Sequence, residues 1–444
     1  MIRAVISSQR GAEEITGDHP SPIESSSSGQ AYVLAAQQLR DAIGRGWITA
    51  DPYRILADAV QPASLDLRLG KVAMPLRCSF LPDPGSSVEA KAEDLAYDEI
   101  DIRGDGAVLE KDRPYLIPLL EELRLPEHLR GKANPKSSTG RLDVFTRVIT
   151  DRNYRFDEIQ PGYHGRLYLE VVSRSFAIRV KEGLSLNQLR LATGDARVPD
   201  DDLRRWHAQH PLLYVDTKPL RTGDLDIAGG LFLIVALDSG TAVDNAVGYR
   251  AKPNSDPIDL SSRGNNLADY WDPVTPDRGR HRIVLEPDVF YLLLSAEGVS
   301  IPPDWAAEMM AYDPTAGELR THYAGFFDPG FGFDNRKGKH GRRAALEVRA
   351  RDVPFRIEHR QPICKLAFER LAVTPDVLYG EDLGSNYQGQ ETMVSKHFRE
   401  QSAGVTQMKL SGADAQYVPT EDAASRQRLS AAVPSQPTGD DNER

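Results

Sequence analysis

An internal repeat limits the folds open to this chain more than any other feature. Tyr115 and Tyr291 each open a short apolar segment and lie 176 residues apart, and Glu170 and Glu347, each within Leu-Glu-Val, lie 177 residues apart. Further matched pairs follow in the same order: Leu125-Pro126 with Ile301-Pro302, Gly140 with Gly317, Leu142 with Leu319, Pro161-Gly162-Tyr163 with Pro329-Gly330-Phe331, and Leu189 with Leu366. An offset shared by several positions indicates two tandem copies of one domain, rather than chance similarity between strands.

Within each copy the apolar residues form short alternating runs that Pro, Gly and Asp interrupt. Residues 64–69 and 167–171 alternate in this way, which is typical of half-buried strands. One helix is predicted at about 31–46, where Leu34, Leu39 and Ile43 share a face. The pattern predicts a mainly β fold of two tandem domains with short helices and flexible ends.

Shifts in composition set the predicted boundaries. The charged segment 201–225 is predicted to be a linker, and the Ser- and Gln-rich ends are predicted to be disordered. The predicted divisions are a disordered tail at 1–30, a first domain at 31–200 with the working site, the linker at 201–225, a second domain at 226–375, a C-terminal segment at 376–400 and a disordered tail at 401–444.

Charge and cysteine content exclude several classes of protein. The chain has 444 residues and a formal net charge of −11, so it is a poor general binder of duplex nucleic acid. Its two cysteines, Cys78 and Cys364, exclude a disulfide framework and a Cys-rich zinc site. No stretch approaches the 18 apolar residues of a membrane span, and the start lacks an apolar signal region. We expect a soluble, cytoplasmic protein without nucleic-acid or membrane partners.

The segment 135–143 is the strongest candidate for a binding site. It places two cations, Lys136 and Arg141, beside the hydroxyls of Ser137, Ser138 and Thr139 and a glycine at 140. Cations, hydroxyls and an accessible backbone suit an oligophosphate, although the spacing is not that of a P-loop. From composition alone, a solvated turn that caps a helix remains the alternative, and it is the more common one.

A carboxylate inside a predicted strand is the second candidate. Tyr168, Glu170 and Val172 share one face of that strand, and Leu167, Leu169 and Val171 share the other. A carboxylate on a mostly apolar strand can have a raised pKa and act as a general base, whereas the simpler alternative is a surface Glu. Glu347 holds the same position in the second copy and comes next in line.

The segment from Tyr379 to Gln390 is the third candidate. Its aromatic and amide side chains suit either a lid over a nucleotide or a disordered linker. The ten histidines include no His-x-Glu followed by Pro-Cys-x-x-Cys, so the zinc deaminase machinery is absent from the sequence.

Taken together, these segments resemble the dCTP deaminase branch of the dUTPase-like fold, in its long bacterial form with two domains per chain. The motifs that carry the resemblance are residues 61–70, Lys136 to Leu142, Pro161-Gly162-Tyr163-His164-Gly165 followed by Leu169-Glu170, residues 322–332, and Ser385 to Gln390. The resemblance covers about residues 35–400 and implies two tandem dUTPase-like distorted β-barrel domains.

The resemblance also implies an activity, hydrolysis of dCTP to dUTP and ammonia, and a role for each matched residue. Glu170 would be the general base, with Ser137 and Arg141 as its catalytic partners. The residues implied to bind the nucleotide are Lys136, Ser138, Thr139, Gly140, Tyr168, Leu169, Tyr379, Asn386 and Gln390. It further implies Mg²⁺ bound through the triphosphate, no zinc, no metal ligands from the protein, and a homo-oligomer.

Three departures from the family pattern keep other functions open. Lys136 replaces an Arg, Gln160 replaces the Asp before Pro-Gly, and Asn386 replaces a Lys of the tail. One alternative is a dUTP pyrophosphatase, or an enzyme that combines both reactions; Gln160 disfavours it in the first copy, although Asp328 keeps the Asp in the second. Another alternative is a non-catalytic nucleotide-binding regulatory protein. The second copy has Asp313 to Glu318 where the first has its Ser-Ser motif, so we expect the first copy to hold the working site.

Overall fold

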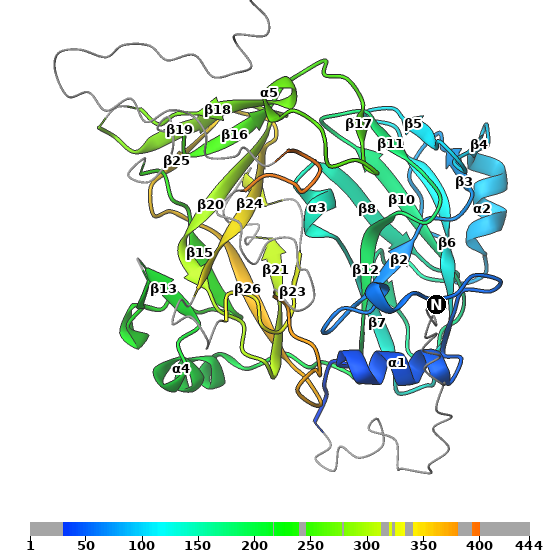
Figure 1. The fold of residues 1–444 in the computed structure, drawn as a ribbon, viewed down its shortest axis with the longest axis horizontal. Helices are drawn as coiled ribbons and strands as arrows, with labels where there is room; N and C mark the ends of the chain where they lie inside the picture. Colours follow the sequence, from blue (N-terminus) through cyan, green and yellow to red (C-terminus); the bar gives the residue numbers. More distant parts are fainter. Residues whose placement is uncertain are drawn as a thin grey trace, which may run out of the picture. The chain divides into compact units, whose positions relative to one another are not determined.

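The structure, a computed structural model, describes residues 30–215, 217–238, 246–277, 279–311, 319–321, 325–333, 341–380 and 393–399 (Figure 1). The tails predicted to be disordered lie almost wholly outside these residues. Among the described residues strands predominate and the helices are short, so the prediction of a mainly β fold is confirmed.

The first copy is built from short strands, as the interrupted apolar pattern predicts. Its elements are α1 (Ala36–Gly44), β1 (Ile48–Thr49), η1 (Ala57–Ala59), β2 (Leu65–Arg68), β3 (Val72–Pro75), α2 (Val88–Leu95), β4 (Ile100–Asp101), β5 (Ala107–Leu109), β6 (Tyr115–Arg124), β7 (Arg130–Pro135), α3 (Ser137–Gly140), β8 (Val144–Ile149), β9 (Glu158–Ile159), β10 (His164–Ser173), β11 (Ile178–Val180) and β12 (Ser185–Ala192).

The second copy follows the same plan. Its elements are α4 (Asp200–Gln209), β13 (Leu213–Val215), β14 (Lys218–Pro219), η2 (Thr222–Asp224), β15 (Leu231–Ile234), β16 (Gly248–Ala251), β17 (Ile258–Asp259), α5 (Leu267–Tyr270), β18 (Trp271–Val274), β19 (Arg282–Leu285), β20 (Phe290–Val299), β21 (Trp305–Ala311), β22 (Leu319–Thr321), β23 (Phe326–Phe327), β24 (Arg342–Ala350), β25 (Phe355–Glu358) and β26 (Pro362–Arg370).

The sheet topology confirms the repeat. In the first copy one sheet runs β3-β6-β10-β8 and another runs β2-β12-β7-β9. In the second copy β16, β20, β24 and β22 pair in the first of these orders, and β15-β26-β21-β23 repeats the second. The two glutamates occupy equivalent positions, since Glu170 pairs with Leu116 of β6 and Glu347 pairs with Leu292 of β20.

The two copies share part of one hydrophobic core. Phe176 of the first copy packs edge-on against Trp271 of the second, with ring centroids 5.3 Å apart. Both side chains belong to a cluster that runs from the barrel of the first copy into β18 and β20 of the second. Strand β17 also pairs in parallel with β11 of the first copy. The two halves therefore meet through a buried apolar interface and a shared strand pair.

Residues 201–225, predicted to be a linker, are instead an ordered part of the second copy. Helix α4 buries Leu203, and β13 pairs with β20. Leu203, Leu212 and Leu225 join the core of the second copy. Most charged residues in its described part are exposed, so the overall composition concealed the few apolar residues that fix it in place.

Candidate active site

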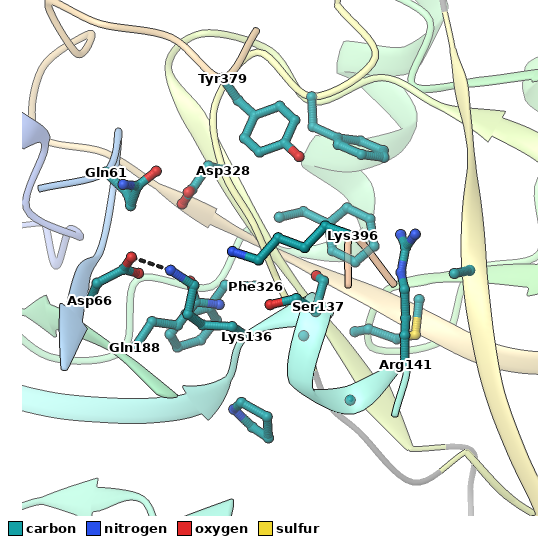
Figure 2. A pocket seen from close by; sticks show the side chains of 18 of the residues that line it. Gln61, Asp66, Lys136, Ser137, Arg141, Gln188, Phe326, Asp328, Tyr379 and Lys396 are labelled. Atoms are coloured by element: carbon teal, nitrogen blue, oxygen red, sulfur yellow. Dashed lines mark hydrogen bonds and ion pairs between the residues drawn. The ribbon is translucent and has the colours of Figure 1, made fainter. Parts of the chain in front are cut away.

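A cavity of about 340 Å³ lies between the two copies, and Figure 2 shows the side chains around it. The first copy contributes the end of β7, α3 and a part of β2. The second contributes β23, the turn after it and β24. The lining residues named below are Asp66, Lys136, Ser137, Ser138, Gly140, Arg141, Arg263, Phe326, Asp328, Glu347, Tyr379 and Lys396. The cavity thus needs both halves of the repeat.

The predicted oligophosphate segment forms the wall on the side of the first copy. Strand β7 ends at Pro135, and α3 then makes a single turn in which the Gly140 amide donates to the Lys136 carbonyl at 3.0 Å. Ser138 and Thr139 are buried. The solvated turn, which composition alone favoured, is therefore not what forms here. Ser137, Ser138, Gly140 and Arg141 line the cavity, whereas Thr139 does not.

The carboxylate at this wall is Glu347 of β24. It is buried, and a Cβ built on Gly140 would lie 2.6 Å from its Oε2 and 2.9 Å from its Oε1, so the carboxylate rests directly against α3. Burial raises the pKa of Glu347 to about 8; the positive charge of Arg141 opposes this rise and the negative charge of Asp143 adds to it. A carboxyl with such a pKa can exchange protons near neutral pH.

The opposite end of the cavity gathers cations. Lys136 is ion-paired with Asp66, and Figure 2 shows the ammonium of Lys396 pointing toward the same group. The pKa of Lys396 is lowered to about 8, first by burial and then by the nearby positive charges of Lys136 and Arg263. Because these cations crowd together in a partly buried place, an anion of several charges would be stabilised there.

Asp328 completes this end. It lies on the turn after β23, is buried, and has a pKa raised to about 6, first by burial and then by the charge of Asp66, while Arg190 opposes the rise. Arg190 Nη2 lies 3.5 Å from Asp328 Oδ1, and the Arg190 guanidinium stacks 3.9 Å above the ring centre of Phe326. Within the part of the chain that the structure describes, Asp328 Oδ1 therefore has no short hydrogen bond.

Glu170, the predicted general base, lies elsewhere. Its carboxylate is ion-paired with Arg147 of β8, whose Nε donates to Oε1 at 2.9 Å, and the Arg147 guanidinium also covers the ring of Phe156 at 3.7 Å. This face of the sheet is covered by α2 and its flanking loops, in an apolar cluster that includes Leu116 and Tyr168. In the second copy the equivalent sheet face, on β24, meets α3 instead. The structure therefore brings Glu347, and not Glu170, to the cavity.

The other predicted residues of β10 also lie away from the cavity. The Tyr168 hydroxyl donates to Glu89 of α2 at 2.9 Å, and Leu169 is buried in the core of the first copy. They lie there because β10 occupies the middle of a sheet whose outer face is covered by the chain itself.

The C-terminal candidates are only partly described. Tyr379 lines the cavity, and its amide donates to the carbonyl of Pro329 at 2.8 Å. Asn386 and Gln390 lie outside the described residues. Residues 393–399, which belong to the predicted C-terminal segment 376–400, do reach the site: Ser395 Oγ donates to the carbonyl of Ser138 at 2.8 Å.

Sequence reasoning left out several of the residues that the cavity gathers. Asp66 lies inside segment 61–70, a motif of the family resemblance that could have singled it out, and Asp328 is the second copy's match for Gln160, to which the sequence analysis gave no binding role. Lys396 and Arg263 stand in polar segments without a motif, and only the folded chain brings them to the cavity.

The described residues hold neither a cluster of metal-ligating side chains nor a membrane-spanning helix. There, no group of three or more His, Cys, Asp or Glu side chains could hold a metal ion. In the same part of the chain, no helix has both the length and the apolar character needed to cross a bilayer.

Comparison with known proteins identifies the family. Models of the N-terminal and C-terminal domains of 2'-deoxycytidine 5'-triphosphate deaminase match residues 30–195 and 199–398. A crystal structure of 2'-deoxycytidine 5'-triphosphate deaminase from Agrobacterium tumefaciens is 40% identical with a TM-score of 0.72, and the match covers 78% of this chain and 100% of that chain. The chain belongs to the dCTP deaminase family. The resemblance inferred from the motifs is confirmed, and the chain is an enzyme.

Shorter curated members of the dCTP deaminase family match about a third of the chain. A "dCTP deaminase, dUMP-forming" from Corynebacterium glutamicum (strain R) is 27% identical over 162 residues, which are 36% of this chain and 79% of that protein. One with the same description from Parafrankia sp. (strain EAN1pec) is 32% identical over 164 residues, 36% of this chain and 75% of that protein. A "dCTP deaminase" from Haemophilus ducreyi is 27% identical over 151 residues, 32% of this chain and 75% of that protein.

Proposed function

We propose that the chain hydrolyses dCTP to dUTP and ammonia in the cavity between its two copies, with Glu347 as the general base. The contact between Glu347 and α3 supports this proposal most directly, because it joins a buried carboxylate that lines the cavity to the hydroxyls and guanidinium of the matched motif. Both halves of the family pattern thereby meet in one site, although they come from different copies.

In the proposed reaction Glu347 accepts a proton from water as the water oxygen bonds to the amino-bearing carbon of cytosine. The proton then passes to the ring nitrogen. Glu347 next accepts the proton of the new hydroxyl and delivers it to the amino group, and the carbon–nitrogen bond breaks as the carbonyl forms, which releases ammonia. Ser137 would hold the water, and Arg141 would lie beside the pyrimidine and stabilise the carboxylate form of Glu347. No zinc takes part in this scheme.

The cationic end suits the triphosphate. Lys136, Lys396 and Arg263 would bind it, with α3 hydroxyls and amides as further donors. Phosphate binding would compete with the ion pair between Lys136 and Asp66. The described donor set fits Mg²⁺ carried by the nucleotide, because the cavity offers the carboxylate oxygens of Asp66 and Asp328 rather than a complete cage; the ion would neutralise phosphate charge.

Formation of dUMP is the second candidate. Gln160 disfavours a pyrophosphatase in the first copy. The Pro-Gly turn beside the cavity, however, belongs to the second copy, where Asp328 precedes it. A buried carboxylate without a short hydrogen bond could hold a water for attack on the α-phosphorus, which would release pyrophosphate. Several relatives are described as dUMP-forming, which also supports testing for this product.

Product analysis with dCTP and Mg²⁺ tests these proposals. It is combined with the substitution of Gln for Glu at the two equivalent positions, 347 and 170. Glu347→Gln should lower ammonia release by about 100-fold or more while nucleotide binding persists, because it removes only the proton acceptor. Glu170→Gln should keep most of the turnover per folded molecule. Thermal unfolding of this variant gives the folded fraction for that correction. Pyrophosphate and dUMP among the products would establish the second reaction.

Three outcomes would contradict the assignments. Loss of turnover in Glu170→Gln at unchanged stability, with an active Glu347→Gln, would return the site to the first copy. Binding of dCTP by the unchanged protein without any ammonia would support the regulatory alternative. dUTP as the final product would agree with the proposed deamination and contradict only the second candidate, formation of dUMP.

A further inference from the structure

A buried ion pair joins the two copies next to the proposed site. Asp143 of the first copy contacts Arg349 of the second, and these side chains are only 1% and 5% exposed. The Ser175 hydroxyl also donates to Asp143 Oδ2 at 2.6 Å, and Arg349 donates to the carbonyl of Asp288. Both charged groups are thus tied to the backbone or side chains of their own copy as well as to each other.

The pair lies directly beside the contact between Glu347 and Gly140. Asp143 follows α3, and its amide donates to the Gly140 carbonyl at 2.9 Å. Arg349 lies two residues beyond Glu347 in β24, so the two side chains leave the strand on the same face. The ion pair and the contact of the carboxylate with α3 therefore fix the same two elements, α3 and β24, against each other.

The repeat shows that the domain fold itself does not require this pair. At the offset of 177 residues, Val172 stands in the first copy where Arg349 stands in the second, and Arg320 stands where Asp143 would be repeated. The first copy forms the same sheets without such a pair. Because the ion pair stands where α3 meets Glu347 and is not repeated at the equivalent positions, we expect it to hold α3 and β24 together.

Energetics also favour a role in arrangement over one in stability. Burying two charges costs about as much as their attraction returns, so such a pair adds little net stability, whereas removing one partner leaves a costly buried charge. A pair of this kind discriminates strongly against arrangements in which α3 and β24 have shifted relative to each other.

We propose that Asp143 and Arg349 are positioning residues that lock β24 against α3 and so hold the Glu347 carboxylate at the reacting end of the cavity. This proposal rests on the proposed role of Glu347. The charged groups that act on Glu347 are Arg141 and Asp143 from the first copy. Arg349 leaves the same face of its own strand two residues further on, while β20 presents Leu292. The pair then sets both the place and the charge of the carboxylate.

The test uses two substitutions with opposite expected signs in the pH profile of kcat. Asp143 raises the pKa of Glu347, so Asp143→Asn should move the rise of kcat to lower pH. Arg349→Met leaves Asp143 without its cation and should move the rise to higher pH, by about one unit. In both variants kcat should fall more than tenfold while KM for dCTP changes little, since the cationic end is intact.

Controls separate this role from general stabilisation. Lys132→Met removes another ion pair between the copies, with Glu308 at 2.5 Å, and should leave the pH profile unchanged. Arg349→Lys keeps the charge, so its kcat should rise at the same pH as in the unchanged protein. This variant still reports on the role of the charge if Arg349→Met fails to fold. An unmoved profile in both Asp143→Asn and Arg349→Met, with kcat falling only in proportion to folded protein, would overturn the proposal; if Arg349→Met does not fold, the unmoved profile of Asp143→Asn decides.

A second measurement does not depend on turnover. The carboxyl carbon signal of Glu347 can be assigned by its loss in Glu347→Gln and titrated in protein labelled with ¹³C-glutamate. Opposite shifts of this titration in the two variants would support the pair even if dCTP were not deaminated, whereas an unaffected titration in an active enzyme would refute it.

Discussion

At the scale of single residues, the chain shows how one motif acquires two chemistries. Glu170 and Glu347 stand in the same Leu-Glu-Val segment and the same strand position. Arg147 neutralises the first within a closed face, whereas the second rests on α3 with a pKa raised to about 8 by burial. The repeat could be found from the sequence, but the partner of each glutamate could not, because Arg147 and α3 reach them through tertiary packing.

The pH dependence follows from two groups of the cavity. Glu347 must be deprotonated to act as a base, so kcat/KM should rise with pH up to about 8. Lys396, whose pKa is lowered to about 8, loses its charge above that value and should then raise KM for dCTP. Steady-state kinetics from pH 6 to 10 check this expectation, and a flat profile across this range would contradict it.

At the scale of secondary-structure elements, the decisive contact is between α3 and β24. Figure 1 shows α3 on the side of the first copy that faces β24 and the C-terminal segment. Glycine at 140 is required because the Glu347 carboxylate approaches where a side chain would stand. The sequence predicted that this glycine allows close approach, but it predicted a phosphate as the approaching group.

Substitution of this glycine tests the contact. Gly140→Ala should displace the Glu347 carboxylate and lower kcat by about 10- to 100-fold, since a misplacement of about 1 Å has effects of this size. Unfolding should be little affected, because alanine suits a helical turn. Gly44→Ala at the end of α1 is the matched control, because its Cβ would meet no atom within 4 Å. Equal kcat in the two variants would argue against the contact.

At the scale of the whole described chain, the two copies depend on each other. The site draws on both, and Trp271 of the second copy packs among aromatic side chains that include Phe176 of the first. The predicted homo-oligomer is a separate matter; sedimentation of the purified protein would determine the number of chains in the assembly.

The shared core predicts cooperative unfolding. Trp271→Ala should lower the free energy of unfolding by about 3–5 kcal/mol, the usual cost of emptying a large buried aromatic position. Tyr154→Ala, at a residue that is 60% exposed, should change it by less than about 0.5 kcal/mol. Urea unfolding followed by fluorescence and circular dichroism checks both, and two separate transitions in the unchanged protein would contradict a shared core.

The sequence by itself determined the repeat, the mainly β fold, the motif at 136–142 and the family that these features indicate. These are properties of local pattern and spacing, which strand pairing and turn chemistry preserve. Only the tertiary structure decided which glutamate faces that motif, and that Asp66, Asp328, Lys396 and the pair of Asp143 and Arg349 surround it. The reason is physical: a sequence motif fixes a residue's place on its own strand, whereas its chemistry depends on the element that covers that strand.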